Sequence, residues 1–470
     1  MKNPLTVKAA LVALTFCILL IPLAMIGGIV SERAARQQAV VQEIAASSYA
    51  RQSYAGPILL LPYTEEFEEL VKTEKETSRV KRSYARTLLL FPHSADMDGT
   101  VAVSTKRRGL FKARVFNWKA AVRGEFRLEG KREVERSRAD SRLIWGQPRL
   151  GLAISDVRGL AGTPQLSWDG AALKLERGST IKGMEGGVHA EVPAFDIERP
   201  QRFPFALQFA LQGTEALAIV PLAGDNRISL HSDWPHPSFG GQFLPQADTQ
   251  KVGKDGFDVK WALSGLATNA REKLTAGCAP AEAAALPAAS QPRKAAECAG
   301  QIEVRFIEPV DIYTLSDRAL KYGFLFVGLT IGVFLLFELL QQWPIHPAQY
   351  LLVGLALATF FLLLLALSEH VAFWIAYLAA AAACIALLGV YLGAVLGGAA
   401  RGLGFAALLA LLYASLYGLL VSEDNALLLG AGLVFAALAA AMLLTRRLDW
   451  YRLEGSAGSV WNGGIAAPGG

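Results

Sequence analysis

Six apolar runs, each long enough to cross a bilayer as a helix, dominate this chain of 470 residues. A helix needs about 20 apolar residues to span the hydrocarbon core. One run lies near the N-terminus and five follow one another closely in the C-terminal part. The runs are Ala9–Val30, Tyr322–Leu340, Tyr350–Leu367, Val371–Ala400, Gly402–Ser422 and Asn425–Thr445. The sequence therefore predicts an α-helical polytopic membrane protein with about six transmembrane helices.

The first run predicts an uncleaved anchor at residues 1–30. A cleavable signal peptide usually has an apolar core of about 7–15 residues and an A-x-A-like site after it. Ala9–Val30 is longer than such a core, and Ser31-Glu32-Arg33 follows it without such a site. We therefore favour a membrane anchor over a signal peptide.

Residues 31–320 predict a large β-rich domain between the first and second spans. Glu32–Tyr49 lacks Gly and Pro and is expected to continue the first helix. Beyond it, short alternating runs such as Gly124–Gly130 and Phe257–Leu263 are separated by turn residues, a pattern typical of antiparallel strands. Residues 279–300 are rich in Ala and Pro and predict a flexible insertion.

A weak internal repeat is compatible with a duplicated β module. Leu88–Pro92 followed by Asp96 is similar to Leu217–Pro221 followed by Asp225, at an offset of 129 residues (221 − 92). A module of that length fits twice into the domain. Chance similarity between two short segments explains the match equally well.

The charges of the short loops predict the orientation of the spans, because Lys and Arg prefer cytoplasmic loops. Arg401 precedes the fifth span and Arg446 follows the sixth, whereas Ser368–His370 and Ser422–Asp424 carry no Lys or Arg. Both termini are therefore expected in the cytoplasm, with residues 31–320 on the opposite side. Residues 321–446 form the five-helix membrane domain, and residues 447–470 form a cytoplasmic tail.

Cysteine indicates the compartment only weakly. Cys17 and Cys384 lie inside apolar runs, where a free thiol behaves as a small apolar side chain. Cys278 and Cys298 flank the Ala/Pro-rich insertion, so in an oxidising compartment a disulfide or two free thiols are equally compatible with their spacing.

The segment His231–Gly241 is the most distinctive candidate interaction loop of the polar domain. Imidazole and carboxylate groups at His231, Asp233 and His236 suit zinc, but their spacing is not that of an established zinc site. An ordered loop anchored by Trp234 and Phe239 is the favoured interpretation, and contact with lipid or a protein partner is a further one. No catalytic or nucleotide-binding motif accompanies it, so neither an enzyme nor a cofactor is expected.

Polar residues in the membrane part form a second group of candidates. They are Glu338, His346, Glu369, His370, Glu423 and Asp424. Ionisable groups inside a bilayer often mark transport pathways, but these residues lie near the ends of spans or in turns. Interfacial anchoring is therefore favoured over a proton relay or transport pathway.

Several ordered strings resemble the CreD family of bacterial inner-membrane proteins, also called cell envelope integrity proteins. They are Asp311–Gly323, Ile345–Ala356, Leu367–His370, Ser422–Leu428, Thr445–Tyr451 and the loop Ser232–Pro245. The resemblance covers nearly the whole chain, apart from residues 279–300 and the Gly-rich tail. It implies a periplasmic domain on a six-helix unit of the inner membrane, linked to envelope stress and to sensitivity to colicins and β-lactams. It implies no catalytic residue or ligand.

The expected function is therefore non-enzymatic support of the cell envelope, with the bilayer and a periplasmic or envelope protein as partners. A transporter or lipid-handling protein using the membrane helices is the alternative, and a metal-dependent hydrolase at the Trp234 loop is a third hypothesis. The net charge of +5 without a basic block gives no reason to expect nucleic acid. The sequence does not predict an oligomeric state.

Overall fold

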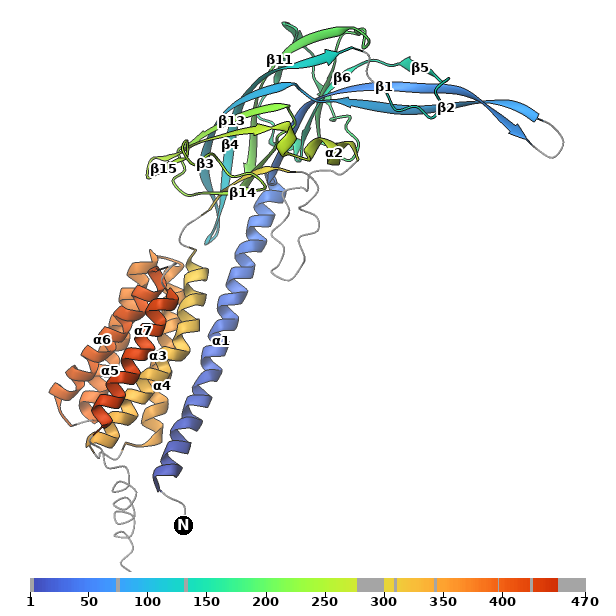
Figure 1. Cartoon of the computed structure of the whole chain (residues 1–470). Helices are drawn as coiled ribbons and strands as arrows, with labels where there is room; N and C mark the ends of the chain where they lie inside the picture. The colour runs from blue at the N-terminus through green and yellow to red at the C-terminus, as the bar shows by residue number, and fades with distance from the viewer. Residues whose placement is uncertain are drawn as a thin grey trace, which may run out of the picture. The chain divides into compact units, whose positions relative to one another are not determined.

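The computed structural model describes residues 4–72, 77–130, 134–276, 300–307, 311–341, 345–395, 397–422 and 426–446. The chain divides into a helical unit, Met1–Gln38 with Val310–Gly470, and a β-rich unit, Ala39–Pro309. Figure 1 shows the elements of both units. In the sequence, the β-rich unit lies between the first and the later membrane helices, as predicted.

Among its described residues, the helical unit contains five helices that are long and apolar enough to cross a membrane. The helices of this unit are α1 (Pro4–Ser47), α3 (Ile312–Gln341), α4 (Pro347–Ser368), α5 (Phe373–Val395), α6 (Ala399–Val421) and α7 (Ala426–Thr445). The sixth predicted span forms α7, whose apolar part, Leu428–Leu443, is shorter than the other five. The 30-residue run Val371–Ala400 is divided: α5 ends at Val395, and Gly397 has a φ of 61°, which suits glycine at a helix end.

Glycine allows close helix contacts in this unit. A Cβ on Gly402 of α6 would lie 2.6 Å from the carbonyl oxygen of Gly389 in α5, and one on Gly354 of α4 would overlap Leu19 of α1. Such small residues let membrane helices approach closely. Aromatic rings fill the remaining interior, where Phe360 lies 4.6 Å from Tyr413 and 5.4 Å from Tyr377 between ring centroids.

The β-rich unit is built from two sheets among the described residues. The nine-stranded sheet has the order β14 (Pro237–Gly241), β17 (Ile302–Phe306), β12 (Ala216–Val220), β1 (Gln52–Lys72), β6 (Arg149–Ile154), β10 (Gly187–Glu191) and β9 (Glu176–Arg177). Two further strands, β2 (Thr77–Leu90) and β5 (Arg142–Trp145), also pair with β1.

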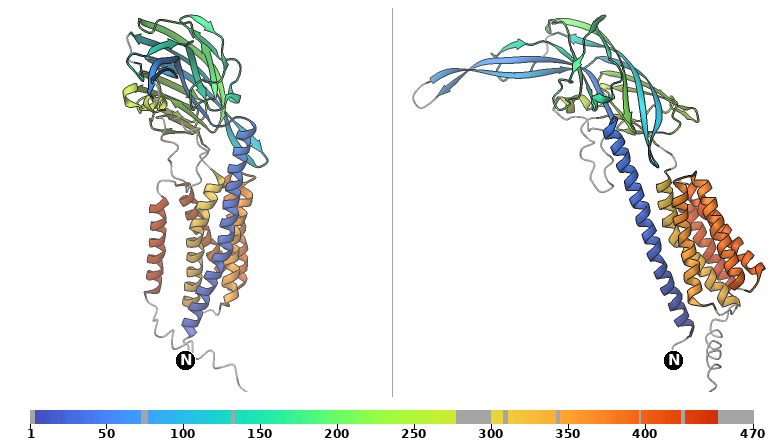
Figure 2. Two further views of the ribbon diagram at one scale, coloured as in Figure 1. Left: turned by 90° about the vertical axis from the view of Figure 1, so that its right-hand side faces the viewer. Right: turned by 180° about the vertical axis from the view of Figure 1, so that it is seen from behind.

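The eight-stranded sheet has the order β15 (Lys251–Gly253), β16 (Gly256–Ser264), β13 (Asp225–Ser232), β3 (Ser94–Arg108), β4 (Phe111–Glu129), β11 (Pro200–Thr214), β7 (Gln165–Trp168) and β8 (Ala171–Leu173). Short helices η1 (Val157–Gly159), η2 (Gly265–Ala267) and α2 (Ala270–Thr275) lie between strands. Figure 2 shows the sheets from two further sides.

Most strand pairs are antiparallel, as the turn-rich sequence predicts, but β1 with β12 and β3 with β13 are parallel. A parallel pair needs a long crossover connection. In both pairs the partners lie more than a hundred residues apart in the sequence, so the alternation within each strand gives no sign of them.

The two sheets share one hydrophobic core. Tyr54 of β1, Trp118 of β4 and Phe209 of β11 are all buried, and the Phe209 ring lies 5.1 Å from Tyr54 and 5.0 Å from Trp118. The burial pattern of β4 alternates over most of its length, so one face of the strand is directed into this core. Because the rings come from both sheets, the sheets pack face to face.

The two segments of the weak repeat lie next to each other. Ser94 of β3 is paired with Asp225 of β13, and the Gly224 amide donates to the Pro92 carbonyl at 3.0 Å. Arg271 of α2 donates to the carbonyls of Leu222 (2.7 Å) and Pro92 (3.2 Å). The segments are therefore structural neighbours, while a duplication stays a prediction.

Replacing Trp118 by Ala is expected to destabilise the β-rich unit by about 3–5 kcal/mol, because it leaves a large cavity between the sheets. The matched control is Trp145→Ala, since Trp145 of β5 is 37% exposed and lies outside the shared core; its cost should stay below about 1 kcal/mol. Urea unfolding of the full chain in detergent measures both. Equal losses would contradict the assignment of the core.

Candidate functional site

The Trp234 loop is held in place by contacts of its aromatic residues. The indole Nε1 of Trp234 donates to the carbonyls of His236 (3.0 Å) and Ile307 (3.2 Å), and the Arg114 guanidinium lies 4.7 Å from the ring centroid. Phe239 packs edge-on against Phe257 and Trp261, with centroids 5.7 and 6.1 Å apart. These contacts describe an ordered loop.

The three candidate metal ligands of this loop lie at its surface. His231, Asp233 and His236 are exposed, and an Asp233 carboxylate oxygen lies 3.5 Å from the Val103 amide. Among the described residues no group of three or more His, Cys, Asp or Glu side chains is placed to hold a metal ion. The structure thus gives the metal-dependent hydrolase hypothesis no support.

Glu338 is the buried acid of the helical unit. It lies near the end of α3, is 3% exposed, and accepts hydrogen bonds from the Tyr350 hydroxyl of α4 (2.5 Å) and the Ile345 amide (3.0 Å). A buried polar group costs free energy unless it is paired, and two donors meet this requirement here. The carboxyl group therefore connects α3 to the start of α4.

Glu369 forms a second connection within the helical unit. One of its carboxylate oxygens accepts from the Tyr313 hydroxyl of α3 at 3.1 Å and lies 3.7 Å from the Arg33 Nε of α1. Glu369 stands at the C-terminal cap of α4, so this contact joins three helices. Arg33 and Tyr313 were not among the residues singled out in the sequence, because no spacing rule relates positions so far apart.

The two histidine candidates contact backbone groups at the two ends of α4. The His346 side chain accepts from the Ala348 amide at 3.2 Å. The side-chain oxygen of Gln349 accepts in turn from the His346 amide, which completes a capping box. A ring nitrogen of His370 lies 3.1 Å from the Ala366 carbonyl. Glu423 and Asp424 lie outside the described residues, as do Cys278 and Cys298 and nearly all of the insertion 279–300.

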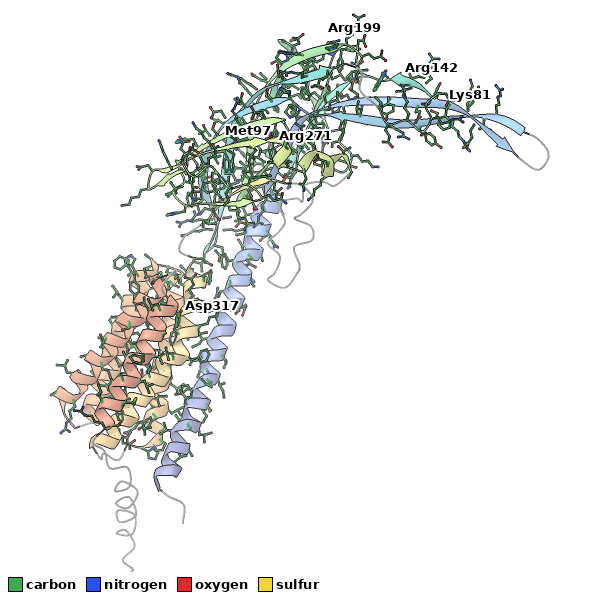
Figure 3. All side chains as sticks on the ribbon, in the orientation of Figure 1. Lys81, Met97, Arg142, Arg199, Arg271 and Asp317 are labelled. Carbon is green, nitrogen blue, oxygen red and sulfur yellow. The ribbon has the colours of Figure 1, made fainter. Side chains whose placement is uncertain are left out.

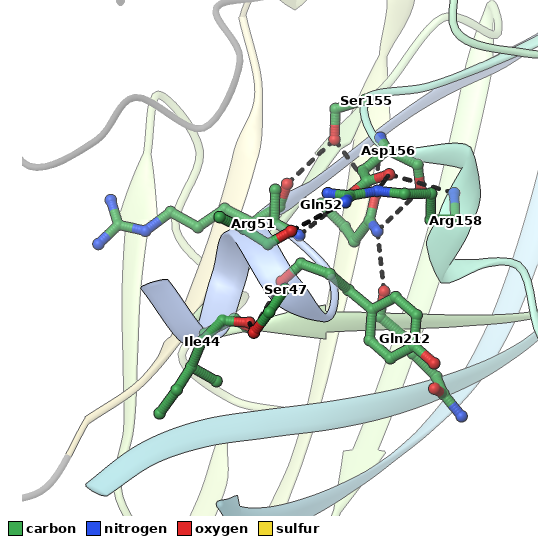
Figure 4. A network of polar contacts seen from close by, with 12 residues as sticks. Ile44, Ser47, Arg51, Gln52, Ser155, Asp156, Arg158 and Gln212 are labelled. Carbon is green, nitrogen blue, oxygen red and sulfur yellow. Dashed lines mark hydrogen bonds and ion pairs between the residues drawn. The ribbon is translucent and has the colours of Figure 1, made fainter. Parts of the chain in front are cut away.

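A polar network holds the point where α1 ends and β1 begins (Figure 4). The Asp156 carboxylate accepts from the Ala50 amide (3.0 Å) and from Arg158 (2.8 Å), and Arg158 also donates to the Ala46 carbonyl (2.9 Å). The side-chain Nε2 of Gln52 donates to the backbone carbonyls of Asp156 (3.0 Å) and Gln212 (2.8 Å). Polar groups at the helix end are thereby satisfied by the β-rich unit.

The contacts of Asp156 lower its pKa. The hydrogen bonds from the Arg158 side chain are the largest cause, and they outweigh partial burial, which acts in the opposite direction. Backbone N–H groups of Ala50 and Arg158 stabilise the carboxylate further. The network is therefore built around an ionised acid.

A hairpin that the sequence analysis did not single out projects from the sandwich. We call residues 63–72 of β1 and 77–86 of β2 the arm (Figure 1). Its two strands carry opposite charges, and cross-strand ion pairs connect them: Arg82 with Glu69 (2.9 Å), Arg79 with Glu68 (3.7 Å) and Arg86 with Glu65 (3.6 Å). Figure 3 labels Lys81 and Arg142 in this region. The signal in the sequence is an acidic segment followed, a few residues later, by a basic one.

Glu65 fixes the base of the arm. Its side chain is fully buried and accepts from the Ser137 amide (2.6 Å), the Ser137 hydroxyl (2.9 Å) and the Arg138 amide (3.3 Å). Burial alone would raise the pKa of Glu65, but the hydrogen bonds, including one from Ser141, outweigh it and hold the pKa below its usual range. An ionised Glu65 thus attaches the loop 134–141 to the arm.

The fold and these sites define a class: a multi-pass membrane protein with a large β-rich domain between its first and later membrane helices. A model of the family described as inner membrane protein CreD matches residues 4–451. The chain is 34% identical over 451 residues to the inner membrane protein CreD of Escherichia coli (strain K12), covering 96% of this chain and 95% of that protein. The chain belongs to the CreD family of inner membrane proteins.

Two solved structures show only distant similarity. Leukotriene A4 hydrolase from Saccharomyces cerevisiae has a TM-score of 0.19 and 11% identity over 37% of this chain and 29% of its own. The InvG secretin domain from Salmonella has a TM-score of 0.08 and 7% identity over 36% of this chain and 64% of its own. Neither carries a conclusion about fold or function.

Glu338→Gln and Tyr350→Phe are expected to show an energetic coupling of about 0.5–2 kcal/mol in a double-mutant cycle. Glutamine offers one acceptor oxygen to the two donors that Glu338 pairs, and Tyr350→Phe removes one of these donors. Thermal unfolding in detergent of the two single variants and the double variant measures this coupling. Tyr391→Phe on α5 is the matched control and should be additive with Glu338→Gln. If the effects of Tyr350→Phe and Glu338→Gln on stability are additive, the hydrogen bond between the two residues contributes nothing to stability.

Asp156→Asn is expected to lower the melting temperature at neutral pH, and the difference from wild type should disappear on acidification. Because the folded pKa is lowered, the stabilisation is complete above the unfolded pKa of about 3.9 and is lost as the pH falls through the folded value. Melting curves of both proteins from about pH 7 to about pH 3 test this dependence. Asp255→Asn, an exposed turn variant, should differ little from wild type at any pH.

Proposed function

We propose that this inner-membrane protein supports the integrity of the cell envelope and its tolerance of stress through non-catalytic contacts of its β-rich unit. The β-rich unit would lie in the periplasm and both termini in the cytoplasm. The loop charges support this orientation, with Arg401 and Arg446 on one side and Ser368–His370 on the other. Membership of the CreD family supports the envelope role.

The arm is the structural feature that most supports this proposal. An isolated two-stranded hairpin is at best marginally stable in water. Here the hairpin is maintained by cross-strand ion pairs, by the buried Glu65 and by pairing of β5 with Tyr63–Glu66. None of the described residues of the arm belongs to the shared core. The arm is therefore better explained by contact with a partner than by stability of the sandwich.

A second candidate function rests on the Glu338–Tyr350 pair. A buried carboxyl group between membrane helices is a common feature of transport and proton pathways. In that case the helical unit would move a small molecule or a lipid, and the β-rich unit would be secondary. Loss of function in a folded Glu338→Gln variant that keeps the arm would favour this candidate.

Shortening the arm is expected to abolish function without unfolding the protein. Residues 66–83, whose ends are paired with each other in the hairpin, are replaced by Asn-Gly, which favours a tight turn. The shortened chain should fail to restore envelope permeability and stress tolerance in an Escherichia coli strain lacking CreD, while its membrane level and melting temperature stay close to wild type.

The matched control for this experiment is removal of the β15–β16 hairpin tip, Gly253–Gly256, a short turn on the other sheet. That variant should complement fully. Full complementation by the arm-shortened chain would refute a role of the arm, and no defect in a strain lacking the protein would refute the envelope function itself.

A further inference from the structure

The two long edges of the arm are covered differently. On the β1 side, β5 pairs with Tyr63–Glu66, and beyond it Arg138 donates to the Glu68 carbonyl at 3.1 Å. The same guanidinium lies 5.9 Å from the centroid of the Phe67 ring. The edge of β1 is therefore paired or covered along much of the arm.

On the β2 side, no described strand pairs with the outer edge. β2 pairs with β1 alone, and of residues 79–87 all are exposed except Arg86, which is half-buried. In a strand of this length about half of the residues direct their backbone N–H and C=O groups to the open side. Natural proteins usually cover, shorten or charge such an edge, because it is a template for another strand.

The charge of this edge selects the kind of strand that can pair with it. Arg79, Lys81, Arg82 and Arg86 lie in the segment, and residues 77–90 contain no acid. Side chains alternate between the two faces of a strand, so Arg79 and Lys81 share one face and Arg82 and Arg86 the other. Lys81 makes no ion pair with the described residues.

The neighbour that β2 already has is acidic, since β1 provides Glu65, Glu68 and Glu69 as its ion-pair partners. A second copy of β2 at the open edge would place cations opposite cations, which is destabilising in a sheet. A guanidinium has five N–H donors, so Arg79 and Arg82 retain donors for a second carboxylate.

We propose that the open edge of β2, residues 79–87, binds an acidic, extended polypeptide segment of a partner protein as an added strand. Main-chain hydrogen bonds supply the pairing, and carboxylates at alternating positions meet the cations of β2. This binding mode rests on the function proposed for the β-rich unit and gives its partner a chemical class.

The test uses the full chain in detergent or nanodiscs and a fluorescent peptide with the sequence of residues 63–71, Tyr-Thr-Glu-Glu-Phe-Glu-Glu-Leu-Val. Fluorescence anisotropy should show binding that weakens as salt is raised from about 0.05 to about 0.5 M. The same peptide with every Glu replaced by Lys should not bind.

Two N-methylated peptides separate strand addition from simple charge attraction. One carries N-methyl groups at odd positions and the other at even positions, so each removes the donors of one side of the strand. Because an added strand pairs through one side only, one peptide should bind like the parent and the other should not. Equal binding of both peptides would overturn the proposal, as would no binding of the parent peptide.

Lys81→Glu should weaken binding of the peptide about tenfold, whereas Lys119→Glu, on the exposed face of β4, should leave it unchanged.

Cross-linking of two copies through β2 in preference to the peptide would overturn the proposal in favour of a dimer. If the peptide binds but the arm-shortened chain still complements, the role of the arm in the envelope function is refuted and strand addition stands. If the arm is required for complementation but no acidic peptide binds, strand addition is refuted and the role of the arm in the envelope function stands.

Discussion

The backbone hydrogen bonding of β1 is the interaction on which the β-rich unit depends. An extended strand has donors and acceptors along both edges, and each must find a partner when it is buried. β1 pairs with β12, β6, β5 and β2, and so joins the interior of the nine-stranded sheet to the arm. The network of Asp156 and Gln52 matters because it sets where the helix stops and this strand starts.

Both units use a buried carboxyl group to attach a neighbouring segment. Glu65 collects N–H and O–H donors from the loop 134–141, and Glu338 collects them from Tyr350 and Ile345. In each case the acid lies on a long regular element and the donors come from a segment that follows in the chain. A short hydrogen-bonded set of this kind specifies one arrangement, because leaving any member unpaired costs more than the contact contributes.

The sequence predicted what is decided locally. Hydrophobicity is a local property, so the run Tyr350–Leu367 lies within α4. The absence of Gly and Pro over Glu32–Tyr49 predicted that the first helix continues, and α1 does continue, ending at Ser47. The anchoring of Trp234 and Phe239 also follows from their size. Pairing of Gln52 with Leu217, or of Tyr313 with Glu369, depends on segments far apart in the chain, and no periodicity reports it. The arm was not predicted from the sequence, because its cross-strand ion pairs join positions that no periodicity relates.

The position of β12 has a consequence for the order of assembly. This strand lies between β1, whose Gln52 pairs with Leu217, and β17, which ends at Phe306 just before α3 begins at Ile312. Sequence-distant pairings of this kind form slowly, because the entropy of closing a long loop is lost before the strand contacts can form. The nine-stranded sheet cannot be completed until almost the whole unit has been synthesised. Until β17 has been synthesised, the chain therefore carries an incomplete sheet with unpaired edges, and such edges favour aggregation.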